Sequence, residues 1–262
     1  MKVAVCVKRI PDTAESEIKV DDTGKDIIKD KLAFIINEPD NYALEEALIL
    51  REKSGGTVVL VSIGPKETEE VLRIGLAKGA DEAVRIDNAG LAGSDAIVLA
   101  GVLAAYFRKE QFDLVFTGCI AQDTQDSQVG PALAQFLGWP HAMYAIRFEN
   151  KDNEVVVRRE LEGGSLEVKR LNRPCVVSFQ TGGNAPRYAS ILGIRQARTK
   201  PLERLDIASL GLEQDEVGDT GSKTRLIKLY VPKVSSAAEI LQGTVDEKVS
   251  KIATIIKEKG LL

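Results

Sequence analysis

The segment best suited to bind a ligand is a loop of small, hydroxyl and amide residues that separates a strand pattern from a helix pattern. It runs from Gly118 to Val129. Backbone N–H groups at the start of a helix lack partners within the helix, so such a loop can bind phosphate there. Ser127 and Thr124 can add hydroxyl donors. The alternative is a plain turn in which Asp126 or Ser127 caps the helix, because the loop lacks the residues of a Walker loop or a dinucleotide fingerprint.

A second candidate segment is Asn37-Glu38-Pro39-Asp40, which precedes a helix that the pattern places from about Tyr42. Pro39 and Asp40 suit the start of a helix, so capping is one explanation of these residues. The functional interpretation places the segment over the end of the first strand, where it can contact an adenine.

Catalysis and metal binding find little support among the chemically active residues. His141 is the only histidine, which excludes histidine-rich metal sites. We expect it to open a strand rather than to serve a Ser–His–Asp triad. The three cysteines fit neither a disulfide framework nor a zinc site. Glu160 and Glu162 have the same strand parity, but ion pairing explains them better than acid–base chemistry. We therefore expect no catalytic residue and no metal site.

The composition predicts a globular protein that works without nucleic acid or membrane. Apolar residues make up 44% of the 262 residues, charged residues 28%, and the net charge is −4. A mildly acidic chain gives no reason to expect nucleic acid or an anionic membrane as partner. No apolar run approaches the roughly 18 residues of a membrane span, and the N-terminus is too short in apolar residues for a signal peptide. We expect a cytoplasmic location.

The first two thirds of the chain alternate strand and helix patterns. Strands are predicted at 3–7, 57–63 and 113–118, and helices at 41–53, 66–78 and 94–109, the last with Ser94 or Asp95 as N-cap. This alternation predicts an α/β fold, a parallel doubly wound sheet of flavodoxin-like or Rossmann-like order, covered by helices on both faces. Ligands of such sheets bind beyond the carboxyl ends of the strands, which include Lys8, Ile63 and Gly118 onward.

After Trp139-Pro140 the pattern changes to four strands that we predict to be antiparallel, at 142–148, 155–161, 165–171 and 175–179. Turns are expected at 152–153 and 163–164, a polar connector at 199–220, and a helix at about 245–257. We predict a nucleotide-binding body at 1–185 and a C-terminal arm at 186–262, which is too thin to own a core and packs on a partner.

The most specific motif is Val157-Arg158-Arg159-Glu160-Leu161-Glu162-Gly163-Gly164, followed by Pro174 and Pro186-Arg187-Tyr188-Ala189. It resembles the signature region of the β subunit of electron-transfer flavoproteins, which are heterodimers that carry electrons from dehydrogenases. The resemblance extends over nearly the whole chain, through 5–9, 44–48, 62–65, 77–81, 93–97 and 137–140. Lys169 departs from it, because that position is commonly aliphatic in the family.

This resemblance implies a bound AMP without a redox role in this chain, and an FAD held mainly by the α subunit. The implied nucleotide contacts are Cys6, Asn37, Glu38, Pro39, Asp40, Ile63, Gly118, Cys119, Ile120, Ala121, Gln122, Asp123, Thr124, Gln125, Asp126, Ser127, Gln128 and Val129. The implied contacts with a partner dehydrogenase lie in 188–200 and include Tyr188, Ala189, Ile191 and Leu192, with Gly193 allowing a sharp bend. Glu160 maps beside an arginine on the flavin side of the α subunit.

The implied partners are the α subunit, a flavin dehydrogenase of acyl-CoA or amine type as donor, and a downstream electron acceptor. A flavin-bifurcating branch of the family replaces the AMP with a second FAD and oxidises NADH there. Val129-Gly130-Pro131 and Pro11-Asp12-Thr13 resemble that branch, whereas the loop lacks its Asp-Gly-Asp-Thr-Ala sequence. The alternative hypothesis, from another class of protein, is a stand-alone adenine-nucleotide sensor or an adenylating enzyme. Such proteins share this kind of sheet but do not need the arm.

Overall fold

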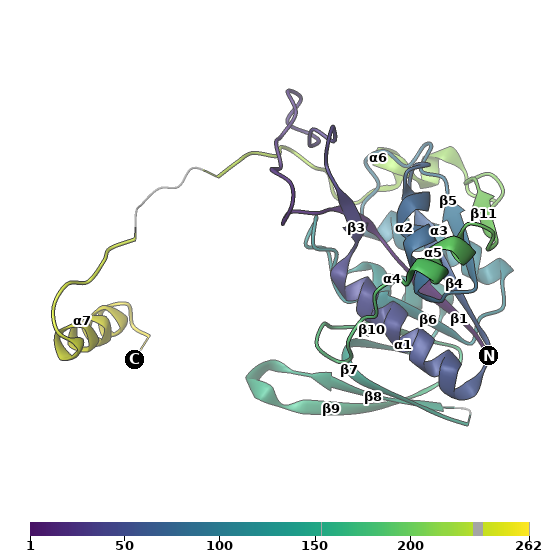
Figure 1. Cartoon of the computed structure of the whole chain (residues 1–262). Helices are drawn as coiled ribbons and strands as arrows, with labels where there is room; N and C mark the ends of the chain where they lie inside the picture. The colour runs from purple at the N-terminus through teal and green to yellow at the C-terminus, as the bar shows by residue number, and fades with distance from the viewer. Residues whose placement is uncertain (153, 233–237, 262) are drawn as a thin grey trace.

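The computed structural model describes residues 1–152, 154–232 and 238–261 and has an α/β body built around one large sheet (Figure 1). The order of the nine strands is β11-β5-β4-β1-β6-β10-β7-β8-β9. Among the described residues, no helix is long and apolar enough to cross a membrane.

The predicted parallel, doubly wound sheet is confirmed. Its parallel strands are β1 (Lys2–Cys6), β4 (Thr57–Ile63), β5 (Glu82–Ile86), β6 (Leu114–Gly118), β10 (Cys175–Phe179) and β11 (Leu202–Leu205). The crossover helices are α1 (Glu38–Ser54), α2 (Thr68–Lys78), α3 (Ala96–Lys109) and α4 (Val129–Leu137). Asp95 caps α3, as one of the two predicted caps, because its side chain accepts from the N–H groups of Ile97 and Val98.

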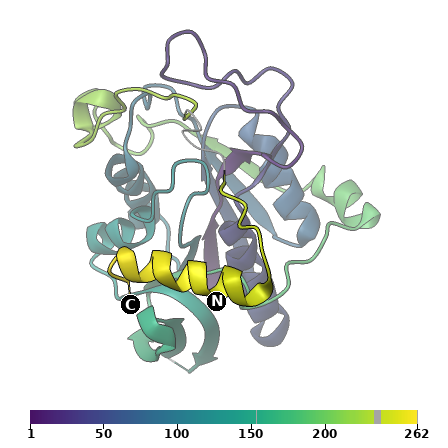
Figure 2. The ribbon, with the colours of Figure 1, turned by 90° about the vertical axis from the view of Figure 1, so that its left-hand side faces the viewer.

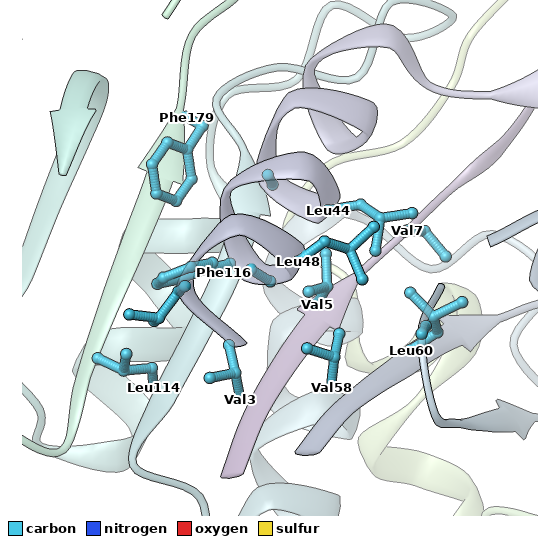
Figure 3. Close-up of a cluster of buried hydrophobic side chains, with 14 of the residues drawn as sticks. Val3, Val5, Val7, Leu44, Leu48, Val58, Leu60, Leu114, Phe116 and Phe179 are labelled. Carbon is cyan, nitrogen blue, oxygen red and sulfur yellow. The ribbon is translucent and has the colours of Figure 1, made fainter. Parts of the chain in front are cut away.

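Apolar layers on both faces of the sheet hold the helices in place. Figure 3 shows one of them, in which Val3 and Val5 of β1 and Phe116 of β6 face Leu44 and Leu48 of α1. The other layer lies under α3 and α4 and includes Ala4, Val115 and Val176. Successive strand residues point to opposite faces, so these continuous apolar runs supply both layers.

The antiparallel prediction holds for three of the four later strands. β7 (His141–Lys151), β8 (Glu154–Glu160) and β9 (Leu166–Asn172) form an antiparallel edge, and the turn at η1 (Glu162–Gly164) holds Gly163 and Gly164 at φ +76°. The prediction is wrong for β10, which pairs in parallel with both β6 and β7. All five β10 residues are buried, as befits a central strand. The predicted turn at 152–153 includes Asn153, which lies outside the described residues.

Several short elements were not expected from the sequence. β5 was missed, and β2 (Arg9–Pro11) and β3 (Phe34–Ile36) form a small antiparallel pair. The prediction of an irregular connector at 199–220 is wrong for residues 202–205, because they form β11, which pairs with β5 at the edge of the sheet. Near it lie α5 (Ile191–Ala197), η2 (Gln214–Glu216) and α6 (Gly218–Gly221). Leu210 and Val217 are buried in the α3-side core, so this stretch packs on the body.

An ion-pair clamp joins the segment before α5 to α1. The Arg187 guanidinium donates to both carboxylate oxygens of Glu45, from Nη2 at 2.8 Å and from Nε at 3.0 and 3.1 Å, and also pairs with Glu52. The Glu45 side chain is only 7% exposed. A two-point guanidinium–carboxylate contact also sets orientation. The clamp therefore determines how residues 186–190 leave the sheet.

The last helix, α7 (Val245–Glu258), was predicted within one residue at its C-terminal end. Thr244 and Glu247 form a capping box at its start, and none of its residues is buried. Figure 1 shows α7 standing apart from the body, and in Figure 2, which faces that side, the helix lies in front of it. Its apolar stripe, which includes Val249 and Ile252, is uncovered in the single chain.

Replacing Arg187 with alanine should destabilise the body. The change leaves the Glu45 carboxylate buried without its counter-charge, so we expect the free energy of unfolding in urea to fall by roughly 3 kcal/mol. Arg170→Ala is the control, because its pair with Glu154 is exposed and should contribute only about 0–1 kcal/mol. Equal losses in the two variants would contradict the role of the clamp.

Candidate functional site

A pocket opens at the carboxyl ends of β1, β4 and β6. The central parallel strands β5, β4, β1, β6 and β10 run in chain order 3-2-1-4-5, so the order reverses between β1 and β6. Open α/β sheets bind ligands at this switch point. Leu99 and Leu103 of α3 and Val129 of α4 supply apolar walls, which places the pocket on the α3 and α4 side of the sheet.

The floor of the pocket is held by a buried carboxylate. Asp40, 6% exposed, accepts the backbone N–H of Lys8 through Oδ2 at 2.8 Å and that of Gly118 through Oδ1 at 3.0 Å. One side chain thus joins the chain just after β1, the end of β6 and the start of α1. Burial raises the pKa of Asp40 to about 7, against the opposing effect of its hydrogen bonds. Gly118 is required here, because a Cβ would collide with Asp40 Oδ1.

Asn37 fixes the loop after β6 from the other side. Its Nδ2 donates to the Ile120 carbonyl at 2.9 Å, and its Oδ1 accepts from the Gln122 N–H at 3.0 Å. Asn37 occupies the N-cap position of α1, but its side chain makes no cap hydrogen bond within that helix. Helix α1 therefore begins at Glu38, four residues before the predicted start at Tyr42, and the candidate segment 38–40 is its first turn. Pro39 suits that turn, because its missing N–H needs no partner there.

The loop from Cys119 to Gln128 leads into α4, whose N-terminus has no side-chain cap. Neither Asp126 nor Ser127 caps α4; Gln128 holds the N-cap position and its side chain makes no cap hydrogen bond. Among the hydrogen bonds of the described residues, the N–H groups of Ser127, Val129 and Gly130 have no acceptor. Such N–H groups favour an anion at the positive end of the helix.

The structure brings most of the predicted contact residues to this pocket. Those that line it are Cys6, Asn37, Asp40, Ile63, Gly118, Cys119, Ile120, Ala121, Asp126, Ser127 and Val129. Those that do not line it are Glu38, Pro39, Gln122, Asp123, Thr124, Gln125 and Gln128. Several of the second group stabilise the loop instead: Lys8 Nζ donates to Asp123 Oδ1 at 2.7 Å, and Gln122 Nε2 donates to Glu38 Oε2 at 3.0 Å.

Eight lining residues were not among the predicted contacts. They are Val7, Lys8, Val61, Ser62, Leu99, Leu103, Thr117 and Gly130. Lys8 stands at a strand end that the sequence already pointed to. The threonine at the end of the apolar run 114–116 was the available signal for Thr117. No sequence signal identified Leu99 and Leu103 as lining residues, because a sequence does not tell which face of a helix covers a pocket.

The chemistry of the pocket fits an adenine nucleotide. Apolar side chains can cover a base, and the free N–H groups of α4 can bind its phosphate. The thiols are unsuited to nucleophilic chemistry, since burial raises the pKa of Cys119 to about 11 and that of Cys6 still further. A low-pKa thiolate would be needed for such a role.

The predicted docking residues form an exposed apolar surface around α5. Tyr188 is 96% exposed, Ile191 77% and Leu192 64%, whereas Ala189 packs against the core. The expectation that Gly193 makes a sharp bend is wrong. Gly193 lies inside α5, its N–H is bonded to Ser190 Oγ, and its missing side chain lets the helix approach the Ala77 carbonyl.

Glu160 is the exposed last residue of β8, and its carboxylate accepts from Gln180 Nε2 at 3.3 Å. Glu162 lies in the η1 turn and not in β8. The prediction that Glu160 and Glu162 share one face of a strand is therefore wrong. His141 opens β7, as expected, and is exposed. Partial desolvation of the imidazole and the nearby Lys169 and Arg159 lower the pKa of His141.

Comparison with known proteins identifies the family. The model of the electron transfer flavoprotein domain matches residues 26–210. The electron transfer flavoprotein subunit beta of Methylophilus methylotrophus is 40% identical, with 98% of each chain covered, and that of Bacillus subtilis is 35% identical, with 99% of each covered. The caffeyl-CoA reductase-Etf complex subunit CarD of Acetobacterium woodii is 32% identical over the full length of both chains.

These matches span the body, the pocket and the arm alike, and they agree with the motif from Val157 to Gly164. The chain belongs to the β-subunit family of electron transfer flavoproteins, which are electron carriers rather than enzymes.

Proposed function

We propose that this β subunit binds AMP in the pocket between β1 and β6, helps to hold an FAD carried mainly by an α subunit, and docks the dehydrogenase that supplies electrons. The observation that carries the proposal is the uncapped start of α4 beside apolar walls at the switch point of the sheet. Electrons pass through the FAD to a downstream acceptor, and the nucleotide of this chain has a structural role.

The residues of the pocket divide the work of holding AMP. Ile63, Leu99 and Leu103 cover the adenine, and the N–H groups at Val129 and Gly130 bind the phosphate. Asp40 and Asn37 contribute by holding the strand ends and the loop in place. Of the charged residues that line the pocket, Lys8, Asp40 and Asp126, only Lys8 is a cation.

A second FAD in place of AMP is the alternative, as in the bifurcating branch. It is favoured by the name of one relative, the acryloyl-CoA reductase electron transfer subunit gamma of Anaerotignum propionicum, 32% identical over both full chains. The missing Asp-Gly-Asp-Thr-Ala sequence in the loop favours AMP. Denaturing the purified heterodimer and identifying the released nucleotides separates the two: one FAD with one AMP supports the proposal, and two FAD support the alternative.

The surface formed by Tyr188, Ile191 and Leu192 is the proposed contact with a flavin dehydrogenase of acyl-CoA or amine type. An exposed aliphatic side chain at the start of a short helix can enter a pocket on a partner, as interface hot spots do. The α subunit covers the part of the arm that ends in α7, and it approaches the sheet end at Glu160, which is available there as an exposed carboxylate. The arm would then bury the stripe at Val249 and Ile252.

Introducing a negative side chain at the proposed phosphate site should expel the nucleotide. In Ser127→Glu, a carboxylate stands a few ångströms from the phosphate, and like charges so close repel by several kcal/mol, so binding should weaken by roughly a hundredfold or more. The measurement is the nucleotide content of the purified heterodimer. Ser54→Glu, at the exposed C-terminal end of α1, is the control. A full equivalent of nucleotide in Ser127→Glu places the site elsewhere.

Shortening the proposed anchor should weaken docking without touching the flavin. Ile191→Ala should cost about 1–3 kcal/mol of binding to the dehydrogenase. Electron transfer from the dehydrogenase at subsaturating flavoprotein measures this loss, while flavin content and reduction by dithionite stay normal. Ile28→Ala alters an exposed isoleucine outside this surface and serves as control. An unchanged rate in Ile191→Ala moves recognition away from α5.

Expression of the chain without the α subunit should leave its arm open to proteases. Leu229 is still tied to the loop at Gly24, because its backbone N–H donates to the Gly24 carbonyl at 2.8 Å, whereas α7 has no buried residue. Limited proteolysis should therefore cut beyond about residue 230 in the single chain, and co-expression with the α subunit should protect the same bonds. Equal protection in both samples would show that the arm needs no partner.

A further inference from the structure

Two buried hydroxyl groups form a cross-strand pair at the wall of the nucleotide pocket. Thr117 of β6 and Ser178 of β10 are register partners, and their oxygens lie 2.6 Å apart. Thr117 is 4% exposed and Ser178 is fully buried. Thr117 lines the pocket and Ser178 does not. The nucleotide contacts implied by the family resemblance include neither residue.

The two hydroxyls carry two donor hydrogens, but only one of them can be used in the hydrogen bond between their oxygens. Among the described residues, neither oxygen has another hydrogen-bond partner. A buried hydroxyl proton without an acceptor costs free energy, so the second proton needs an acceptor from outside the chain. Since only Thr117 reaches the pocket, the pair is satisfied when Ser178 donates to Thr117 and Thr117 donates into the pocket.

The position of Thr117 identifies the kind of acceptor. Its side chain has the same strand parity as Val115, which packs on the α3 and α4 side where the pocket lies. A Cβ built on Gly130 would stand 3.1 Å from Thr117 Oγ1 and closer still to Ser178 Oγ, so both hydroxyls lie against the first turn of α4. Val129 and Gly130, whose N–H groups have no acceptor among the described residues, belong to the same turn, and such donors suit phosphate oxygens.

We propose that Thr117 donates a hydrogen bond to a phosphate oxygen of the bound nucleotide and that Ser178, by donating to Thr117, sets the direction of that bond. This assignment rests on the nucleotide site proposed above and adds a side-chain donor to its backbone donors. Thr117 then helps the pocket to distinguish a nucleotide from a nucleoside.

The test compares AMP with adenosine on the nucleotide-stripped heterodimer by calorimetry. Thr117→Val keeps the shape of the side chain and its preference for a strand but removes the hydroxyl. The Kd for AMP should rise by roughly ten- to hundredfold, as for a hydrogen bond to a charged group, and the Kd for adenosine should stay unchanged. Thr117→Ser should restore AMP binding, which a merely structural role of the γ-methyl group would not allow.

Ser178→Ala is the second variant, and it should weaken AMP binding less than Thr117→Val, because Thr117 retains its own proton. Unchanged AMP affinity in Thr117→Val, or equal losses of AMP and adenosine, overturns the assignment while the nucleotide site stands. A larger loss in Ser178→Ala overturns the direction of the bond. If the unaltered heterodimer binds neither AMP nor adenosine, the proposed AMP site itself fails, and the role of Thr117 with it.

Discussion

The geometry of the pocket depends on the hydrogen bonds of Asp40. The backbone ladder between β1 and β6 runs only as far as Val5 and Phe116, so the residues that follow these strands need another link to each other and to α1. The Asp40 carboxylate supplies that link through the N–H groups of Lys8 and Gly118. Burying a carboxylate costs free energy of desolvation, and the Asp40 carboxylate can be buried because both of its oxygens accept hydrogen bonds. Asn37 then extends the same support to the loop through Ile120 and Gln122.

The sheet separates the pocket from the exposed apolar surface around α5, the proposed docking surface. The pocket lies on the side of α3 and α4, whereas α5 packs against α2, where Arg73 donates to the carbonyls of Ala197 and Lys200. Arg187 ties the preceding segment to α1 on that same side. The cores on the two faces are distinct layers with no shared side chains. A change in the proposed docking surface should therefore leave the pocket intact.

Much of the fold followed from local patterns. Apolar runs of β-branched residues predicted β1, β4 and β6, and helical spacing with glycine or aspartate at the ends predicted α2, α3 and α7 to within two residues. These elements are visible in the sequence because burial of one stripe or of both strand faces imposes a period. The loop at 118–129 was also recognisable, since its small residues stand where a parallel strand ends. The motif from Val157 to Gly164 further indicated the family, through a resemblance rather than through physical reasoning.

The sequence by itself thus determined the class of fold, the end of the sheet that holds the site, and half or more of its lining. Only the tertiary structure decided which strands are neighbours. β10 lies between β6 and β7, and β11 lies beside β5, although these neighbours do not follow one another along the chain. Long-range neighbours leave no local period, so Thr117 and Ser178, separated by 61 positions, could not be paired from their spacing. The same holds for Leu99 and Leu103, because a helix buried around most of its surface does not reveal which residues face a pocket.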